Sequence, residues 1–355
     1  MPADKSNKAF CVLPWIEDYK DIQGDKNFFC CQSGPTDNNE QELRERLWRG
    51  EKIKQCNNCY TLETNKVISP RLEANARWMK TPEISEYFNT DSCPSPKIYS
   101  YELRSSNKCN LACICCTPVF SSLWEKELGV DTGNKPTTID LPTLNSAKRL
   151  YLSGGEPLII EHYQEIFDYI VEHDLDLELV INTNLSSVSS RTFEKLSKIR
   201  NCLLNISIDS YGKVNEYHRY PLSWDKFINN LDTVKESNIK RRFNTVADAV
   251  SVFGFDKLLD LVDYTTMWDF NILRTPSSLL LENIPTHLKS IATDKVSALK
   301  DSKFYKSDVV FKTKVNAILE QISRPGDSFL LSNYIQQLDA RRKINHEDYL
   351  GIKLT

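Results

Sequence analysis

The sequence predicts an α/β protein: a partial (β/α)6 TIM-like barrel of parallel strands, with a small cysteine-rich N-terminal module and a helical C-terminal tail. Six short apolar runs alternate with helical patterns after residue 97, at the spacing of roughly 25–50 residues that suits βαβ units. Ten of the eleven cysteines lie in the first 116 residues, and the chain from about Pro285 onward is charged and helical in pattern. We therefore expect three parts, at residues 1–96, 97–284 and 285–355.

The pattern along the chain places each element in order. The N-terminal part contains one expected helix near residues 40–53, and the turn-rich stretch at 91–96 marks its end. The strands are expected near residues 97–104, 148–153, 177–183, 202–209, 241–248 and 269–274. The helices between them are expected near residues 118–128, 161–173, 190–199, 223–237 and 255–264. In the tail, an apolar stripe at helical spacing indicates a face that packs on the core, formed by Phe311, Val315, Ile318, Leu319 and Ile322.

Composition and charge exclude several classes of protein. The 355 residues are 40% apolar and 26% charged, which fits a globular protein with a sizeable core. The formal net charge of −3 gives no electrostatic indication of nucleic-acid binding. No apolar run approaches the roughly 20 residues of a membrane span, and Met1–Phe10 is not followed by the apolar segment of a secretory signal. We therefore expect a cytoplasmic protein that binds neither nucleic acid nor membrane.

The cysteines point to metal or redox chemistry. Thiols stay reduced in the cytoplasm, so clustered cysteines there indicate a metal or redox site rather than structural disulfides. The count of eleven is odd, which also fits a disulfide framework poorly. Only five histidines occur, so a metal site must depend on thiolates, which select zinc or iron–sulfur clusters.

The first expected barrel strand leads into Cys109, Cys113 and Cys116, spaced C-x3-C-x2-C. Three thiolates can hold a cubane cluster by one face, whereas a saturated [4Fe-4S] cluster takes four cysteines. Three ligands therefore leave one iron open to another molecule. Spacing alone also permits a zinc site, or a set in which Cys115 replaces Cys116.

The second expected strand leads into Ser153-Gly154-Gly155-Glu156-Pro157. The paired glycines allow a ligand to approach the backbone closely, and the carboxylate of Glu156 can accept a charge-assisted hydrogen bond from an ammonium group. Pro157 stiffens the exit from the turn. An ordinary strand-to-helix turn is the alternative interpretation of this stretch.

These two motifs, in this order at the ends of successive strands, resemble the radical SAM superfamily over roughly residues 97–280. The resemblance implies a [4Fe-4S] cluster held by Cys109, Cys113 and Cys116, with its open iron chelated by the amino and carboxylate groups of S-adenosylmethionine (SAM). It also implies an external flavodoxin- or ferredoxin-like electron donor, and a 5′-deoxyadenosyl radical that abstracts hydrogen from a peptide, a protein or a small metabolite. One position departs from the family's pattern, because the residue before the last cysteine is usually aromatic and here is Cys115.

Further SAM-binding residues follow from the same resemblance, at the ends of the third and fourth strands. They are Asn182, Asn184, Ser207, Asp209 and Arg219, beside Ser153 to Pro157. Arginine is well suited to a carboxylate because it binds in bidentate fashion. The alternatives are a helix cap for Asn184, a cap or surface turn for Asp209, and a surface ion pair for Arg219. For His218, a packed or exposed histidine is a simpler interpretation than a catalytic one.

A second set of cysteines lies in the N-terminal part. Cys11 opens a C-x2-P-W stretch, Cys30 and Cys31 are adjacent, and Cys56 and Cys59 form a C-x2-C pair. This arrangement resembles the auxiliary-cluster modules called twitch or SPASM, although those normally follow the barrel. The resemblance implies a second iron–sulfur cluster that assists electron transfer, with the ligands Cys11, Cys30, Cys56 and Cys59 and with Cys31 as the alternate.

Two alternatives stay open for these cysteines. Thiolate ligands do not distinguish zinc from iron–sulfur. The competing function is therefore a zinc-stapled binding module without catalysis. Cys93 matches neither motif, and we expect it to be a plain buried thiol.

Overall fold

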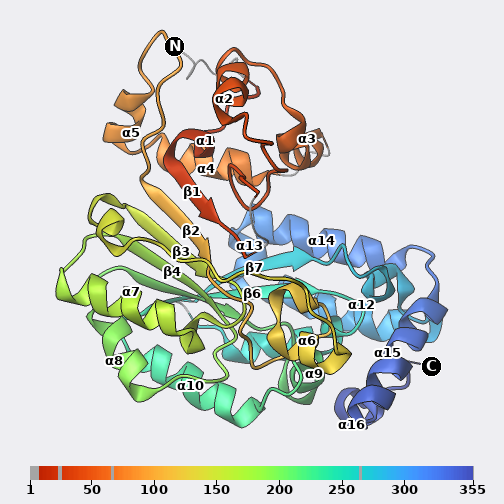
Figure 1. Cartoon of the computed structure of the whole chain (residues 1–355). Coiled ribbons are helices and arrows are strands. Elements are labelled where there is room, and N and C mark those ends of the chain that lie inside the picture. The colour runs from red at the N-terminus through yellow and green to blue at the C-terminus, as the bar shows by residue number, and fades with distance from the viewer. Residues whose placement is uncertain (1–7, 23–25, 65–67, 264–265, 355) are drawn as a thin grey trace. The chain divides into compact units, whose positions relative to one another are not determined.

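The computed structural model describes residues 8–22, 26–64, 68–263 and 266–354 (Figure 1). Within them the strands form a seven-stranded sheet in chain order. The strands are β1 (Glu17–Lys20), β2 (Ser100–Arg104), β3 (Arg149–Ser153), β4 (Glu178–Thr183), β5 (Cys202–Ser207), β6 (Lys240–Ala247) and β7 (Met267–Ile272). The described pairings are parallel, so the predicted α/β class with parallel strands is confirmed. None of the described helices is both long and apolar enough to cross a membrane.

All six predicted strands are present, as β2 to β7. Four of the helices expected between them occur as α6 (Ser122–Leu128), α7 (Glu161–Glu172), α8 (Ser190–Lys198) and α10 (Trp224–Glu236). The helix expected near 255–264 is shorter, because α11 (Phe255–Leu258) passes into a 3-10 turn at Leu259–Leu261, and residue 264 lies outside the described residues. Helix α9 (Gly212–His218) is an additional one. The N-terminal part contains α1 (Leu13–Ile16), α2 (Glu40–Trp48), α3 (Asn57–Thr64), α4 (Pro70–Trp78) and α5 (Pro82–Tyr87). The tail contains α12 (Lys289–Ser297), α13 (Lys303–Ser307), α14 (Val309–Ser323), α15 (Ser328–Arg342) and α16 (His346–Leu350).

The chain divides into two compact units. Unit 1 takes the described residues up to Ser106, with Gly133–Gly154 and Tyr169–Val180. Unit 2 takes Asn107–Thr132 and Gly155–Asp168, with the described residues from Ile181 onward.

Unit 1 is organised around an aromatic cluster. Trp15 is fully buried and its ring lies 5.7 Å from Phe10 and 5.8 Å from Phe88 between centroids. Its indole Nε1 donates a 3.0 Å hydrogen bond to the carbonyl of Pro94, so its one polar atom is satisfied. Strand β1 pairs with β2 in parallel, from Glu17 opposite Ser100.

Unit 2 contains the parallel strands β5, β6 and β7 and the helices of the tail. The side chain of Asp308 caps α14 by accepting from the backbone of Val310 at 2.8 Å. The predicted stripe is confirmed as a core-facing surface, because Phe311, Val315, Ile318 and Ile322 are buried and Leu319 is half-buried. Phe311 packs on Trp268 of β7 at 5.5 Å, which places α14 against that strand (Figure 1).

The carboxyl ends of β5 and β6 meet in unit 2, as they must in a parallel sheet. Asp209, two residues beyond the end of β5, accepts a 2.8 Å hydrogen bond at Oδ1 from the backbone N–H of Val246 in β6. The segments that follow these two strands therefore lie side by side, and they carry much of the candidate site.

Candidate functional site

The three cysteines of the C-x3-C-x2-C motif lie in one loop of unit 2. Burial raises the pKa of the Cys109 thiol to about 11, and the nearby Glu156 and Cys116 add to the rise. Burial also raises the pKa of Cys113, with contributions from Cys116 and Cys109, and the pKa of Cys116. The three thiols are thus close enough to affect one another's ionisation. A desolvated set of this kind becomes a set of thiolates only when a cation compensates the charge.

The backbone of this loop bonds to the end of α9 and to the segment that follows it. The N–H of Ala112 donates to the carbonyl of Tyr220 at 2.6 Å, and the N–H of Ile114 donates to the carbonyl of His218 at 2.8 Å. Both bonds lie between the first and last cysteines of the motif. These bonds therefore hold the backbone of the loop against the end of α9 and the residues that follow it.

The glycine pair makes close backbone approaches that no other residue allows. Gly155 has φ +48°, and a Cβ there would lie 2.2 Å from the carbonyl oxygen of Lys108. That same oxygen accepts a 2.8 Å hydrogen bond from the N–H of Glu156. Gly154 has φ +81°, and a Cβ there would lie 2.9 Å from the carbonyl oxygen of Ser106. Ser153 ends β3, where its hydroxyl accepts from Arg104 at 3.3 Å.

Glu156 is buried and its carboxylate ties the second motif to the end of β4. Oε1 accepts from the hydroxyl of Thr183 at 2.6 Å and from the N–H of Leu158 at 3.1 Å, while Oε2 accepts from the N–H of Asn184 at 2.6 Å. Burial raises the pKa of Glu156 to about 7, against the lowering effect of these hydrogen bonds. Beyond Asn184 the chain turns at Leu185, a buried residue with φ +54°. The carboxylate thus holds a strained strand end in place.

Two asparagines flank this strand end. The Nδ2 group of Asn184 donates to Asn110 in the cysteine loop at 3.1 Å and lies 4.0 Å from Cys109 Sγ. Its Oδ1 accepts from the backbone of Ser186 at 2.8 Å, so the residue caps a turn and not helix α8, whose cap is Ser189. Asn182 Oδ1 is buried without a hydrogen-bond partner among the described residues.

Asp209 and Arg219 lie in the interior, so the surface alternatives for both residues are wrong. Asp209 is fully buried, and its Oδ2 lies 2.7 Å from Nη2 of Arg219. Nη1 of Arg219 lies 3.8 Å from Cys113 Sγ. Arg219 Nε is buried and donates to no acceptor among the described residues. Ser207 ends β5 and is half-buried. The guanidinium therefore bridges a buried carboxylate and a motif cysteine and retains one donor for a ligand.

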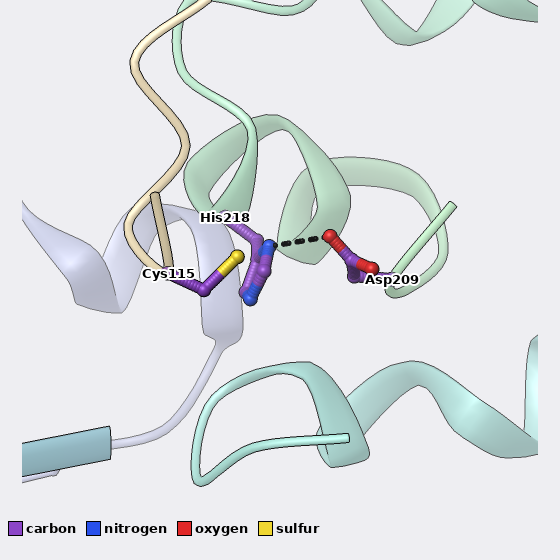
Figure 2. Close-up of side chains that lie close together, drawn as sticks. All are labelled: Cys115, Asp209 and His218. Carbon is purple, nitrogen blue, oxygen red and sulfur yellow. Dashed lines mark ion pairs between the residues drawn. The ribbon is translucent and has the colours of Figure 1, made fainter. Parts of the chain in front are cut away.

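The sequence did not indicate the surroundings of His218. This residue is fully buried between two carboxylates. Its Nδ1 lies 3.0 Å from Asp209 Oδ2 (Figure 2), and its Nε2 lies 2.5 Å from Asp248 Oδ2. Burial alone would lower the pKa of His218, but Asp248 and Asp209 raise it to about 9. Asp248 directly follows β6, and its position at a strand end is the one signal that could have singled it out.

The second set of cysteines lines a cavity of about 210 Å³ in unit 1. The four predicted ligands Cys11, Cys30, Cys56 and Cys59 all contribute to its wall, as does Cys31. Glu17, Glu102 and Arg149 also line this cavity. The structure therefore brings together cysteines that lie up to 48 positions apart in the sequence, from Cys11 to Cys59.

The surroundings of the adjacent cysteines differ. Burial raises the pKa of Cys30, and its strongest charged neighbour is the Cys11 thiol. Burial also raises the pKa of Cys31, but there the neighbouring charges are Glu102 and Glu17. The Cys11 thiol is thus the main charged neighbour of Cys30, and Glu102 is that of Cys31. Cys93 is a half-buried thiol packed on the apolar core of unit 1.

The protein is thus a parallel α/β protein in which two motifs follow successive strands, a C-x3-C-x2-C loop and a Gly-Gly-Glu-Pro turn. Residues 103–257 match the model of the Radical SAM superfamily. The region in which the motifs predicted this family is thus the region that matches its model.

The curated relatives are similar to the chain over part of their length. The GTP 3',8-cyclase of Synechocystis sp. is 24% identical, over 50% of this chain and 53% of the relative. The GTP 3',8-cyclase of Mycolicibacterium smegmatis is 27% identical, over 46% of each chain. The chain thus spans about half the length of the curated relatives it matches.

Solved structures resemble the chain more remotely. "Native anSMEcpe with bound AdoMet" is 18% identical, with a TM-score of 0.43 over 57% of this chain and 59% of that one. Streptococcus suis SuiB bound to S-adenosylmethionine is 16% identical, with a TM-score of 0.38 over 64% of this chain and 59% of that one.

Proposed function

We propose that the chain reductively cleaves SAM at a [4Fe-4S] cluster held by Cys109, Cys113 and Cys116. When bound, the cluster supplies the electron that splits SAM into methionine and a 5′-deoxyadenosyl radical, which abstracts hydrogen from the substrate. The observation that carries this proposal is that Arg219 reaches the loop of the three half-buried motif cysteines. Its guanidinium lies 3.8 Å from Cys113 Sγ, and its Nε has no acceptor in the described chain.

The remaining residues have roles that follow from their contacts. Arg219 would bind the SAM carboxylate, and Asp209 orients Arg219 through their 2.7 Å ion pair. Glu156 fixes the end of β4 and, with the backbone at Gly154 and Gly155, would face the SAM ammonium. The polar groups near the ends of strands β3, β4 and β5 complete the proposed SAM site: Ser153, Pro157, Asn182, Asn184 and Ser207.

Replacement of Cys113 by Ala tests this function. We expect the variant to lose the iron of this cluster and all formation of 5′-deoxyadenosine from SAM under dithionite, because two thiolates do not retain a cubane. Cys202→Ala is the matched control, since Cys202 is buried at the start of β5 in the same unit. Anaerobically purified wild-type protein that is colourless and carries stoichiometric zinc would instead support the zinc-stapled binding module.

We also propose a second iron–sulfur cluster in the cavity of unit 1, bound by Cys11, Cys30, Cys56 and Cys59. The choice of Cys30 over Cys31 rests on its proximity to Cys11. A complete shell of four thiolates leaves no open iron, which favours electron transfer over substrate binding. Residues 1–96 would then be the auxiliary module, residues 97–284 the catalytic barrel, and residues 285–355 a helical extension.

The double variant Cys56→Ala/Cys59→Ala tests the second cluster. We expect reconstituted wild-type protein to hold about eight iron atoms per chain and the variant about four, because each cubane holds four. Cys93→Ala is the control and should keep the wild-type iron content, since Cys93 packs on the apolar core of unit 1. Equal iron content of about four in wild type and double variant would contradict the second cluster.

The substrate that we propose is a peptide, a protein or a small metabolite, with a flavodoxin- or ferredoxin-like protein as electron donor. The reducing conditions that such clusters need fit the cytoplasm. Because the curated relatives are named GTP 3',8-cyclases, GTP is the first small molecule to test. Consumption of GTP together with SAM would assign the small-metabolite class, and unchanged GTP would leave peptides as the first class to screen.

A further inference from the structure

We propose that Cys115, Asp209 and His218 form a binding site for a divalent transition-metal ion, for which zinc is the best-suited probe. One ligand atom from each residue lies within 4.8 Å of the other two. The three come from separate segments of unit 2: the cysteine loop, the residues after β5 and the end of α9 (Figure 2). A thiolate, a carboxylate and an imidazole are the three ligand types that zinc takes in proteins.

Two of the ligand atoms are buried and face each other. Asp209 Oδ2 and His218 Nδ1 lie 3.0 Å apart, and Oδ2 also lies 2.7 Å from Nη2 of Arg219. Two ligands that each lie about 2.0–2.1 Å from one tetrahedral ion approach each other to roughly 3.3 Å. The pair therefore has nearly the separation of two metal ligands, and an ion would take the place of the contact between the two atoms.

The other nitrogen of His218 has the partner that a metal-binding histidine usually has. Nε2 lies 2.5 Å from Asp248 Oδ2, while Asp248 Oδ1 accepts from the N–H groups of Val250 and Ser251 at 2.9 and 2.8 Å. A carboxylate in this position keeps the proton on Nε2 and directs the lone pair of Nδ1 toward the ion. Asp248 is thus the residue that orients the imidazole.

The charges of this group balance with an ion present. Binding of M²⁺ releases one proton from the Cys115 thiol and one from the imidazolium of His218, which leaves a thiolate, a carboxylate and a neutral imidazole around two positive charges. Arg219 remains paired with the carboxylate of Asp209 at 2.7 Å. Three protein ligands leave a fourth position for water. The ion would tie the cysteine loop to the end of β5, and Cys115 would serve this site instead of the cluster.

Zinc and iron content of Cys115→Ser tests the site. The full-length protein is reconstituted with iron and sulfide, loaded with one equivalent of zinc and desalted. We expect wild type and the control Cys202→Ser to retain one zinc per chain, and Cys115→Ser to lose it while its iron content stays unchanged. Equal zinc in all three proteins overturns the proposal, and so does a loss of iron in Cys115→Ser, because that result makes Cys115 a cluster ligand.

Asp248→Asn provides a second variant that keeps the fold of this segment. The amide oxygen can still accept from Val250 and Ser251, whereas its NH₂ group no longer accepts the proton of His218 Nε2. We expect the zinc Kd, measured by competition with a chelating dye, to rise about 10- to 100-fold. An unchanged Kd would contradict the role of His218 as a ligand. Neither experiment depends on SAM cleavage, so each tests the zinc site independently of the proposed function.

Discussion

Replacement of Gly155 by Ala is expected to destabilise the protein by about 2 to 5 kcal/mol and to abolish 5′-deoxyadenosine formation. The added Cβ would lie 2.2 Å from the carbonyl oxygen and 2.7 Å from the carbonyl carbon of Lys108. Both atoms are backbone, so no side-chain rotation relieves the contact. Relief requires the segment at the start of the cysteine loop to move, which also breaks the hydrogen bond from Glu156 to Lys108. Urea unfolding and the SAM cleavage assay measure the two effects.

Gly129→Ala separates steric overlap from backbone strain. Gly129 has φ +64°, similar in sign to Gly155, but a Cβ there meets nothing within 4 Å. Gly129→Ala should therefore lower the free energy of unfolding by only about 1 to 2 kcal/mol, which is the cost of a left-handed backbone for a residue with a Cβ. We expect this control to keep full activity. If the two variants unfold at the same urea concentration and cleave SAM equally well, the close approach at Gly155 has no functional consequence.

The sequence predicted the elements whose signal is local. Strands β2 to β7 are apolar runs bounded by turn residues, and each lies where its pattern indicates. Strand β1 was missed because Glu17-Asp18-Tyr19-Lys20 has no apolar alternation. It is a strand because its backbone pairs with β2, about 80 residues further along the chain, and such long-range pairing leaves no local pattern. Helix α9 was missed because seven residues are too few to show a helical period.

In the candidate site, too, the sequence predicted what is local and missed what depends on distant contacts. The cysteine loop and the Gly-Gly-Glu-Pro turn are each formed by one short stretch of sequence, so their spacing can be recognised. The sequence does not show which groups the Glu156 carboxylate contacts. They are Thr183 and Asn184, which lie at the end of β4, 27 and 28 residues further along the chain. Burial of charged residues is equally hidden, because Asp and Arg are usually exposed. The enclosure of His218 by Asp209 and Asp248 depends on two strand ends meeting, which only the folded chain reveals.

The tail contributes a second set of contacts to the cysteine loop. Arg342, at the end of α15, donates to the carbonyl of Ala112 at 2.7 Å and pairs with Glu127 at 3.1 Å. Its guanidinium lies between two aromatic rings, 4.9 Å from the centre of Trp124 and 4.7 Å from that of Tyr220. Cation–π contacts of this kind strengthen when the cation is desolvated, and the side chain of Arg342 is only 2% exposed.

Arg342→Ala is therefore expected to lower the free energy of unfolding by about 3 to 5 kcal/mol, because it removes a buried cation and leaves the half-buried Glu127 without its main partner. It should also speed the loss of iron from the purified protein, since the carbonyl of Ala112 lies between the first two cysteines of the motif and loses its donor. Arg341→Ala is the matched control: its side chain is 37% exposed and reaches Glu127 only at 3.9 Å, so we expect a change of about 0 to 1 kcal/mol. Urea unfolding gives the stabilities, and the decay of cluster absorbance under a chelator gives the rate of iron loss. Equal decay rates in the two variants, with Arg342→Ala still folded, would show that the tail does not stabilise the cysteine loop.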